Sequence, residues 1–241
     1  MKKQTVLITG ANKGIGLETA RQLAKADYHI YLAARDKDRG DAAVAQLHAE
    51  GLIDVEFIQL EVTSEESVQA AYAELSGKID YLDVLINNAG ILGGFQQSAT
   101  NTPNHIFTEV FEVNVFGIAR MVRVFLPLVL KSPNPRIVNV TSDLGSLTLH
   151  NDPNWEHYQV KTAVYGPSKS ALNAYTIALA YELKGKAKVN MVNPGYTNTE
   201  FNNNMGPKSV EDGAKPIVEY AMLDADGPTG KYMSDTGESP W

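Results

Sequence analysis

Residues 5–16 read TVLITGANKGIG, and this stretch decides the fold. An apolar, strand-like run ends at Thr9, three glycines follow, and a helix-like stretch begins at Leu17. Glycines at a strand-to-helix turn allow backbone N–H groups to approach a pyrophosphate at the N-terminus of a helix. Turns use glycine for other reasons too, so the signal lies in the position between strand and helix. We therefore expect a dinucleotide to bind this turn, through Gly10, Asn12, Lys13, Gly14, Ile15 and Gly16.

The composition is that of an acidic globular protein without cysteine. The chain has 241 residues, of which 44% are hydrophobic and 20% charged, and its formal net charge is −7. This charge argues against nucleic-acid partners, and the lack of cysteine excludes disulfides and thiolate chemistry. His150 and His157 lack a third ligand, so we expect no metal. No apolar run is long enough for a membrane span or a signal peptide, which predicts a cytoplasmic protein without membrane partners.

Apolar segments alternate with segments of helical periodicity along the chain. The runs are nearly all apolar, as in strands buried on both faces of a parallel sheet, and the alternation implies right-handed crossovers. The sequence therefore predicts one α/β domain over residues 1–241, a Rossmann-type doubly wound parallel sheet of about seven strands in the order 3-2-1-4-5-6-7, flanked by helices. We expect strands at 4–9, 28–34, 55–61, 82–87, 136–141, 188–193 and near 230–233, and an irregular tail over 237–241.

The end of the second predicted strand indicates which dinucleotide binds. NAD-binding folds usually place a carboxylate there, on the ribose 2′-hydroxyl. This chain has Ala34 at that position and Arg35 after it, and Lys13 adds a cation from the glycine turn. A 2′-phosphate carries about −1.5 to −2 charges near neutral pH, so the two cations favour NADPH/NADP+ over NADH. The alternative is that both are solvated surface charges. Asp36 either caps the next helix or touches a ribose hydroxyl.

Two further strand ends are expected to border the cofactor. Asn88, Ala89 and Gly90 follow the fourth predicted strand, where the order of the sheet reverses and small residues are needed. The asparagines at this point tie neighbouring strand ends together, or else form a plain turn. Glu61 and Val62 end the third predicted strand, where we expect the adenine to lie.

Tyr165 and Lys169 lie four residues apart, on one face of a predicted helix. The pKa of an isolated tyrosine hydroxyl is about 10, and a nearby ammonium group lowers it. A lowered pKa would let Tyr165 exchange a proton with a substrate oxygen. Alone, such a pair is usually a surface pair. However, Ser142 ends the fifth predicted strand, at the edge where ligands bind, although a serine there is also a common helix cap. Asn114 lies among apolar residues in a predicted helix and either links Lys169 to water or marks a structural kink or strand tie.

These motifs resemble the short-chain dehydrogenase/reductase family in order and spacing, over nearly the whole chain. The resemblance rests on residues 9–16, 87–90, 165–169 and 193–199, and on Asn114 and Ser142. It implies a nicotinamide-dependent oxidoreductase with a catalytic tetrad of Asn114, Ser142, Tyr165 and Lys169. It also implies that Lys169 holds the nicotinamide ribose and that Thr197 and Thr199 lie near the carboxamide and the pyrophosphate. Besides Arg35 and the strand-end residues 61–62 and 88–90, the expected cofactor contacts are Asn114, Tyr165, Lys169, Pro194, Gly195, Thr197 and Thr199.

Two features differ from the usual family pattern. Glu61 stands where the family usually has aspartate, and the spacing between the catalytic serine and tyrosine is longer than usual. The additional residues lie at 149–158, where monomeric carbonyl reductases carry a longer insertion. In the family this segment borders the substrate cleft. Trp155, with His157 and Tyr158, therefore either lines the cleft or packs the loop onto the surface.

The predicted function is NADPH-dependent reduction of an aldehyde or ketone to an alcohol, as in the carbonyl reductase branch that the turn after Ala34 most resembles. Tyr165 is the expected general acid, and it binds the substrate oxygen together with Ser142. The alternatives are an NAD(P)-linked alcohol dehydrogenase that acts oxidatively and a non-catalytic NADP(H)-sensing protein on the same fold. The short, polar segment 200–206 predicts an open site for varied small carbonyls, and the added loop predicts a monomer or homodimer.

Overall fold

The strands of the computed structural model all join one sheet, within residues 3–241, the part of the chain that the structure describes. They are β1 (Thr5–Thr9), β2 (His29–Ala34), β3 (Val55–Gln59), β4 (Val84–Asn87), β5 (Arg136–Val140), β6 (Lys188–Val192), β7 (Tyr232–Ser234) and β8 (Gly237–Glu238). The order is β3-β2-β1-β4-β5-β6-β7-β8, and only β7 and β8 are antiparallel. The predicted doubly wound sheet is confirmed, and residues 1 and 2 of the predicted domain lie outside the described part.

The expected strands agree with the observed ones to within two residues at each end. The prediction of an irregular tail is wrong for Gly237 and Glu238, which form an eighth strand. The turn before β8 closes because Gly237 adopts a φ of 113°, a region that favours glycine. Lys231 then pairs with Glu238 across the hairpin at 2.9 Å. The C-terminal segment is thereby held against β7.

Eight α-helices connect the strands of the described chain. They are α1 (Gly14–Lys25), α2 (Lys37–Ala49), α3 (Glu65–Lys78), α4 (Asn104–Phe111), α5 (Ile118–Val129), α6 (Leu147–Asn151), α7 (Tyr165–Glu182) and α8 (Val210–Ala221). A π-helical turn, η1 (Glu112–Gly117), joins α4 to α5, and 3₁₀ turns form at η2 (Asp143–Gly145) and η3 (Glu200–Asn202). None of the helices in residues 3–241 combines the length and the apolar character that a membrane crossing requires.

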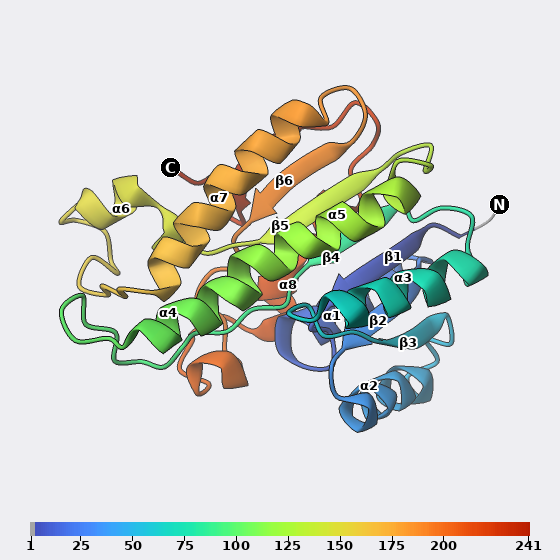
Figure 1. Cartoon of the computed structure of the whole chain (residues 1–241), viewed down its shortest axis with the longest axis horizontal. Coiled ribbons are helices and arrows are strands. Elements are labelled where there is room, and N and C mark those ends of the chain that lie inside the picture. The colour runs from blue at the N-terminus through green and yellow to red at the C-terminus, as the bar shows by residue number, and fades with distance from the viewer. Residues whose placement is uncertain (1–2) are drawn as a thin grey trace.

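The helices cover the sheet from both sides. Leu75, Phe125 and Leu179 belong to one buried cluster that joins α3, α5 and α7 to the sheet, and Figure 1 shows these helices in front of it. Leu23 and Ile217 belong to a second buried cluster, which joins α1, α2 and α8 to the opposite face. Because both faces are covered, the strands are nearly all apolar, and the ligand-binding edge is the one where their carboxyl ends meet.

The helices α2 and α3 each begin at a residue whose side chain caps them. Ser64 Oγ accepts a hydrogen bond from Ser67 N at 3.1 Å and caps α3. Asp36 Oδ1 accepts from Arg39 N at 3.0 Å and caps α2, so of the two roles considered for Asp36 the structure shows the helix cap.

Candidate active site

The glycine turn between β1 and α1 is a backbone cradle. Gly10 and Gly14 have φ values of 63° and 55°, which favour glycine. A Cβ atom added at Gly10 would lie 2.9 Å from Ala89 Cα, and one at Gly16 would lie 2.5 Å from Asn88 Nδ2. Side chains are therefore excluded at Gly10 and Gly16, where the backbone packs closely on the end of β4 at the start of α1. The turn fits the pyrophosphate of a dinucleotide.

The end of β4 is tied to the glycine turn. Asn88 Nδ2 donates to Thr9 O at 2.9 Å and to Gly10 O at 3.1 Å. Thr9 Oγ1 accepts in return from the backbone N–H groups of Asn88 and Ala89, each at 3.0 Å. The asparagine thus links neighbouring strand ends, which is one of the two roles that the sequence left open for it.

Ser142, Tyr165 and Lys169 meet at the carboxyl end of β5. Tyr165 is the first residue of α7, and Ser142 lies close enough to its hydroxyl to lower its pKa. Lys169 lies one turn further along and donates from Nζ to Val140 O at 2.9 Å, with Nζ 5.7 Å from the centre of the Tyr165 ring. Both side chains are buried. The three groups that sequence reasoning chose therefore lie together.

Burial controls the titration of this group. It raises the pKa of Tyr165 to about 12, and the hydrogen bond with Ser142 offsets part of that rise. It lowers the pKa of Lys169 to about 8. The sequence predicts a lowered pKa for Tyr165, and the structure differs because desolvation of the phenol outweighs the nearby amine. At neutral pH the tyrosine is a protonated acid and the lysine is largely charged.

Asn114 lies in the π-helical turn η1 and is fully buried. Its Oδ1 accepts from Ile91 N at 2.9 Å, and its Nδ2 donates to Ile91 O and to Ser168 Oγ, each at 3.0 Å. The side chain therefore ties the loop after β4 to α7. Gly90 lies close to both Asn114 and the Lys169 amine. A Cβ atom added at Gly90 would lie 3.3 Å from Asn114 Oδ1 and 3.7 Å from Lys169 Nζ. The structural tie is the role seen directly.

Gln97 fixes the start of α7 and was not foreseen from the sequence. Its Oε1 accepts from Val164 N at 3.0 Å and from Tyr165 N at 2.8 Å. Its Nε2 donates to Leu92 O at 2.6 Å and to Gly94 O at 2.8 Å. A buried glutamine in a loop thus replaces the usual N-cap residue. Its sequence neighbourhood, rich in glycine, serine and threonine, gives no signal of that contact.

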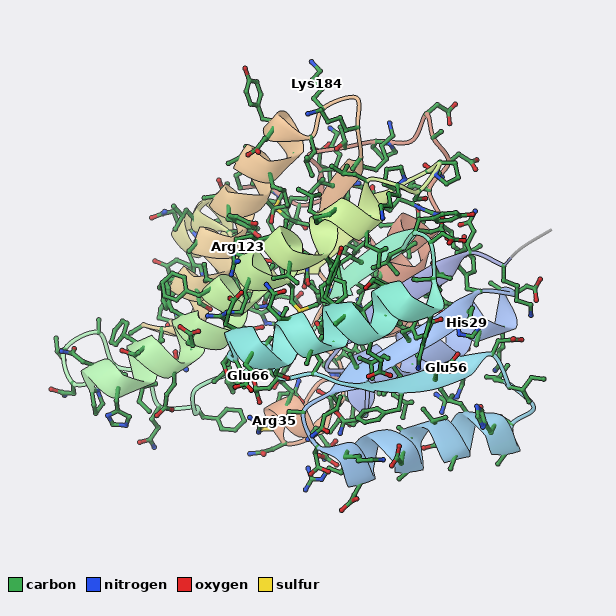
Figure 2. The ribbon with its side chains drawn as sticks, turned by 45° about the vertical axis from the view of Figure 1, so that its right-hand side comes forward. His29, Arg35, Glu56, Glu66, Arg123 and Lys184 are labelled. Carbon is green, nitrogen blue, oxygen red and sulfur yellow. The ribbon has the colours of Figure 1, made fainter. Side chains whose placement is uncertain are left out.

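Three cations lie around the glycine turn, where the 2′-phosphate is predicted. Lys13 Nζ pairs with Glu200 Oε2 of η3 at 2.6 Å. This contact holds the pKa of Glu200 below its ordinary value, and Arg39 adds a smaller effect in the same direction. Arg35 is exposed at the carboxyl edge of the sheet, near the start of α2 (Figure 2). Arg39, in the first turn of α2, was not foreseen. A hollow of about 330 Å³ beside Lys13 and Arg39 is lined by Asn12, Lys13, Arg39, Ala42, Ala43, Gln46 and Glu200.

The residues after β3 are held by local contacts. Glu61 Oε1 accepts from Thr63 Oγ1 at 3.0 Å, and Glu61 Oε2 lies 3.7 Å from Arg35 Nη1. Val62 is buried, and its Cγ2 would lie 3.1 Å from a Cβ atom at Gly117 of η1. The longer glutamate thereby reaches a cation of the neighbouring strand end, and the valine packs against the π-helical turn.

The segment after β6 closes over the glycine turn. Thr199 lies above it, with Cγ2 3.5 Å from where a Cβ atom at Gly14 would be. Thr197 is buried, and its hydroxyl donates within its own turn, to Pro194 O at 3.1 Å and Gly195 O at 3.2 Å. The position of Thr199 agrees with a pyrophosphate contact, whereas the Thr197 hydroxyl is engaged by the backbone.

The loop 149–158 reaches toward the segment after β6 through a chain of rings. Trp155 contacts His150 and His157, with ring centres 5.3 and 5.5 Å apart, and His157 contacts Tyr196 at 5.9 Å. Trp155 therefore packs its own loop, and His157 makes the contact across to the opposite segment. Within residues 3–241 no group of histidine and acidic side chains could hold a metal. A residue not foreseen, Phe201, contacts the ring of Tyr165 at 5.7 Å.

Comparison with known proteins places the chain in a family. It matches the short chain dehydrogenase family over residues 4–209, and it belongs to that family. It is 40% identical to the short-chain dehydrogenase anuI of Penicillium roqueforti, over 91% of this chain and 88% of that protein. It is 32% identical to carbonyl reductase (NADPH) 1 of Mus musculus, over 99% of each chain.

Solved structures agree with that assignment. Salutaridine reductase from Papaver somniferum has a TM-score of 0.85 with this chain at 27% identity, with 97% of this chain and 100% of that chain covered. The NADPH-bound carbonyl reductase from chicken fatty liver has the same fold, with a TM-score of 0.85 at 23% identity and full coverage of both chains. The chain is accordingly an oxidoreductase of the short-chain dehydrogenase family, as the sequence predicted.

Proposed function

We propose that this protein reduces the carbonyl group of a small aldehyde or ketone to an alcohol with NADPH. The observation that carries the proposal is the buried group of Ser142, Tyr165 and Lys169 at the carboxyl end of β5, beside the glycine turn. A protein that only senses a dinucleotide has no need of a buried acid and a buried amine at this edge.

The cofactor assignment is supported by local charge. The chain is acidic overall, yet Lys13 and Arg39 line the hollow beside the glycine turn, and Arg35 follows the end of β2, the strand next to β1. Cations at this point favour a 2′-phosphate over a free hydroxyl, because hydrogen bonds to charged groups contribute roughly 1.5–3 kcal/mol each. The relative from Mus musculus carries NADPH in its name. Gly10, Gly14, Gly16 and Thr199 would hold the pyrophosphate, and Lys169 the nicotinamide ribose.

The chemistry follows from the protonation states. NADPH supplies a hydride to the carbonyl carbon when it is bound. Ser142 and Tyr165 donate hydrogen bonds to the carbonyl oxygen, and Tyr165 transfers its proton to that oxygen as negative charge develops there. A pKa of about 12 keeps the phenol protonated, and the charged Lys169 stabilises the phenolate that remains until a proton returns from solvent.

The substrate cleft is proposed to lie between the loop 149–158 and the segment after β6. Phe201 contacts the ring of Tyr165, and His157 reaches Tyr196 from the loop. These rings favour flat, apolar carbonyl compounds. We place Trp155 behind His157 as a support of this wall. The segment that carries Phe201 is short, which favours an open site for several unrelated small carbonyls.

A spectrophotometric assay tests the proposal. NADPH and NADH absorbance would be followed against a panel of aldehydes and ketones, and NADP+ reduction against the matching alcohols. Tyr165→Phe should lower kcat by about a hundredfold or more, the usual size of a general-acid effect. Tyr220→Phe, a change at a buried tyrosine on α8, is the matched control and should keep wild-type turnover. Normal NADPH oxidation by Tyr165→Phe would refute the assignment.

A further inference from the structure

Tyr232 joins the C-terminal hairpin to the turn that carries Ser142. It lies on β7 and has no exposed surface. Its hydroxyl donates to the backbone oxygen of Ser142 at 2.7 Å and lies 3.3 Å from Asp143 Oδ1. The two residues are 90 positions apart in the sequence. The hydrogen bond therefore fixes the backbone of the serine itself, from a strand at the far end of the chain.

Asp143 brings a second residue of the same hairpin region to this turn. Its Oδ1 accepts from Ser239 Oγ at 3.1 Å. Burial raises the pKa of the Asp143 carboxyl, whereas the hydrogen bonds from Ser239 and Tyr232 oppose that rise, as do the more distant charges of His157 and Lys208. The partly buried carboxyl group of Asp143, next to Ser142 in the chain, is thus held by the hydroxyl groups of Tyr232 on β7 and Ser239 after β8.

Helix α7 holds the other side of the turn. A Cβ atom at Gly145 would lie 2.8 Å from the backbone carbon of Lys169, so η2 packs directly on the helix that carries the lysine. Ser170 Oγ donates to Gly145 O at 2.8 Å. The turn that begins with Ser142 is therefore clamped between α7 and the C-terminal hairpin, and its distance from Tyr165 depends on both contacts.

We propose that Tyr232 and Asp143 are positioning residues that set where the Ser142 hydroxyl lies relative to Tyr165. This inference rests on the proposed function. Neither residue needs to touch the substrate, because both act through the backbone of the turn. A hydrogen bond to a developing oxyanion depends steeply on distance, so a small displacement of Ser142 weakens it in the transition state more than in the bound substrate.

The test is a double-mutant cycle on kcat, with substrate and NADPH KM measured in parallel. Tyr232→Phe should lower kcat by about tenfold, within the hundredfold that a misplacement of 1 Å can cost, and leave the KM for NADPH unchanged. In a Ser142→Ala background the same change should have no further effect on kcat, because the group that it positions is gone. Asp143→Ala should likewise lower kcat when the Ser142 hydroxyl is present and have no further effect in the Ser142→Ala background, whereas Tyr220→Phe should leave kcat unchanged in both.

Each outcome decides between alternatives. Wild-type kcat for Tyr232→Phe, or equal losses with and without the Ser142 hydroxyl, would overturn the inference, since a general loss of stability acts in both backgrounds. Wild-type kcat for Ser142→Ala would overturn the proposed function, and this inference with it. If Tyr232→Phe does not fold, Ser239→Ala provides the same cycle through Asp143, and equal losses in both backgrounds would again refute the positioning role.

Discussion

Replacing Lys169 by methionine should stabilise the fold while it removes activity. Lys169 is 4% exposed, and burial lowers its pKa from the ordinary value of 10.5 to about 8. Each pKa unit corresponds to about 1.4 kcal/mol, so the buried charge costs about 3 kcal/mol at neutral pH. Losing the hydrogen bond to Val140 O offsets about 1 kcal/mol of that gain. The net gain of about 2 kcal/mol corresponds to a rise in Tm of roughly 4–8 °C for a chain of this size.

The pH dependence makes this reasoning specific. Between pH 8 and 10.5 the unfolded lysine binds more protons than the folded one, so the wild type gains stability relative to Lys169→Met as pH rises through this window. Above pH 10.5 the cost of the charge is gone, and the variant should be the less stable protein by about 1 kcal/mol. Thermal unfolding of both proteins at pH 7, 9 and 10.5 measures this crossing.

Activity and a surface control complete the experiment. Lys169→Met should lower reductive kcat by about a hundredfold, because the phenolate loses its neighbouring charge. In the wild type, kcat should fall as pH rises through about 8, where Lys169 loses its proton. Lys184→Met alters an exposed lysine (Figure 2) and should change neither stability nor rate. A destabilised Lys169→Met at pH 7, or a stability difference that does not change with pH, would refute the reasoning.

Three further changes test the cofactor contacts and the start of α7. Arg35→Glu should shift preference from NADPH toward NADH by about tenfold or more, measured as the ratio of kcat/KM values, whereas Arg123→Glu on the far helix should not. Glu200→Gln frees Lys13 from an exposed ion pair, and because such pairs are weak the Kd of 2′,5′-ADP should fall only about two- to fivefold while that of 5′-AMP stays constant. Gln97→Ala leaves two backbone N–H groups without their acceptor and should lower the unfolding free energy by about 1–3 kcal/mol together with kcat. Gln96→Ala, the same change at the exposed neighbour, should alter neither quantity, and wild-type stability of Gln97→Ala would argue against the capping role.

The fold was predictable because its signals are local. Apolar runs, the glycine turn and caps such as Ser64 and Asp36 each depend on a few neighbouring residues, and the sheet order follows from the crossovers. The eighth strand was missed because β8 has only two residues. It exists through its contacts with β7 and through the φ of Gly237, and neither leaves a periodic pattern in the sequence.

The residues of the site that take part in the chemistry were predictable from the sequence, whereas the residues that only hold them in place were not. Tyr165 and Ser142 are visible as chemical groups in the sequence. Gln97 lies 68 residues from Tyr165, and Tyr232 lies 90 residues from Ser142, so their contacts exist only after folding. The same holds for Lys13 and its partner 187 residues away. The pKa of Tyr165 was predicted in the wrong direction because the depth of burial is a property of the fold.

Several departures from what stability alone favours meet at one edge of the sheet. Lys169 places a charge in the protein interior, Gly10 and Gly14 adopt positive φ values in the turn after β1, and η1 widens a helix around Asn114. Sequences selected only for stability avoid such features, because a buried apolar side chain or a regular helix is less costly. Their occurrence at the same edge of the sheet as Tyr165 is a physical argument for the location of the reaction that does not depend on the family motifs. It also explains why the Lys169→Met variant should separate stability from activity so sharply.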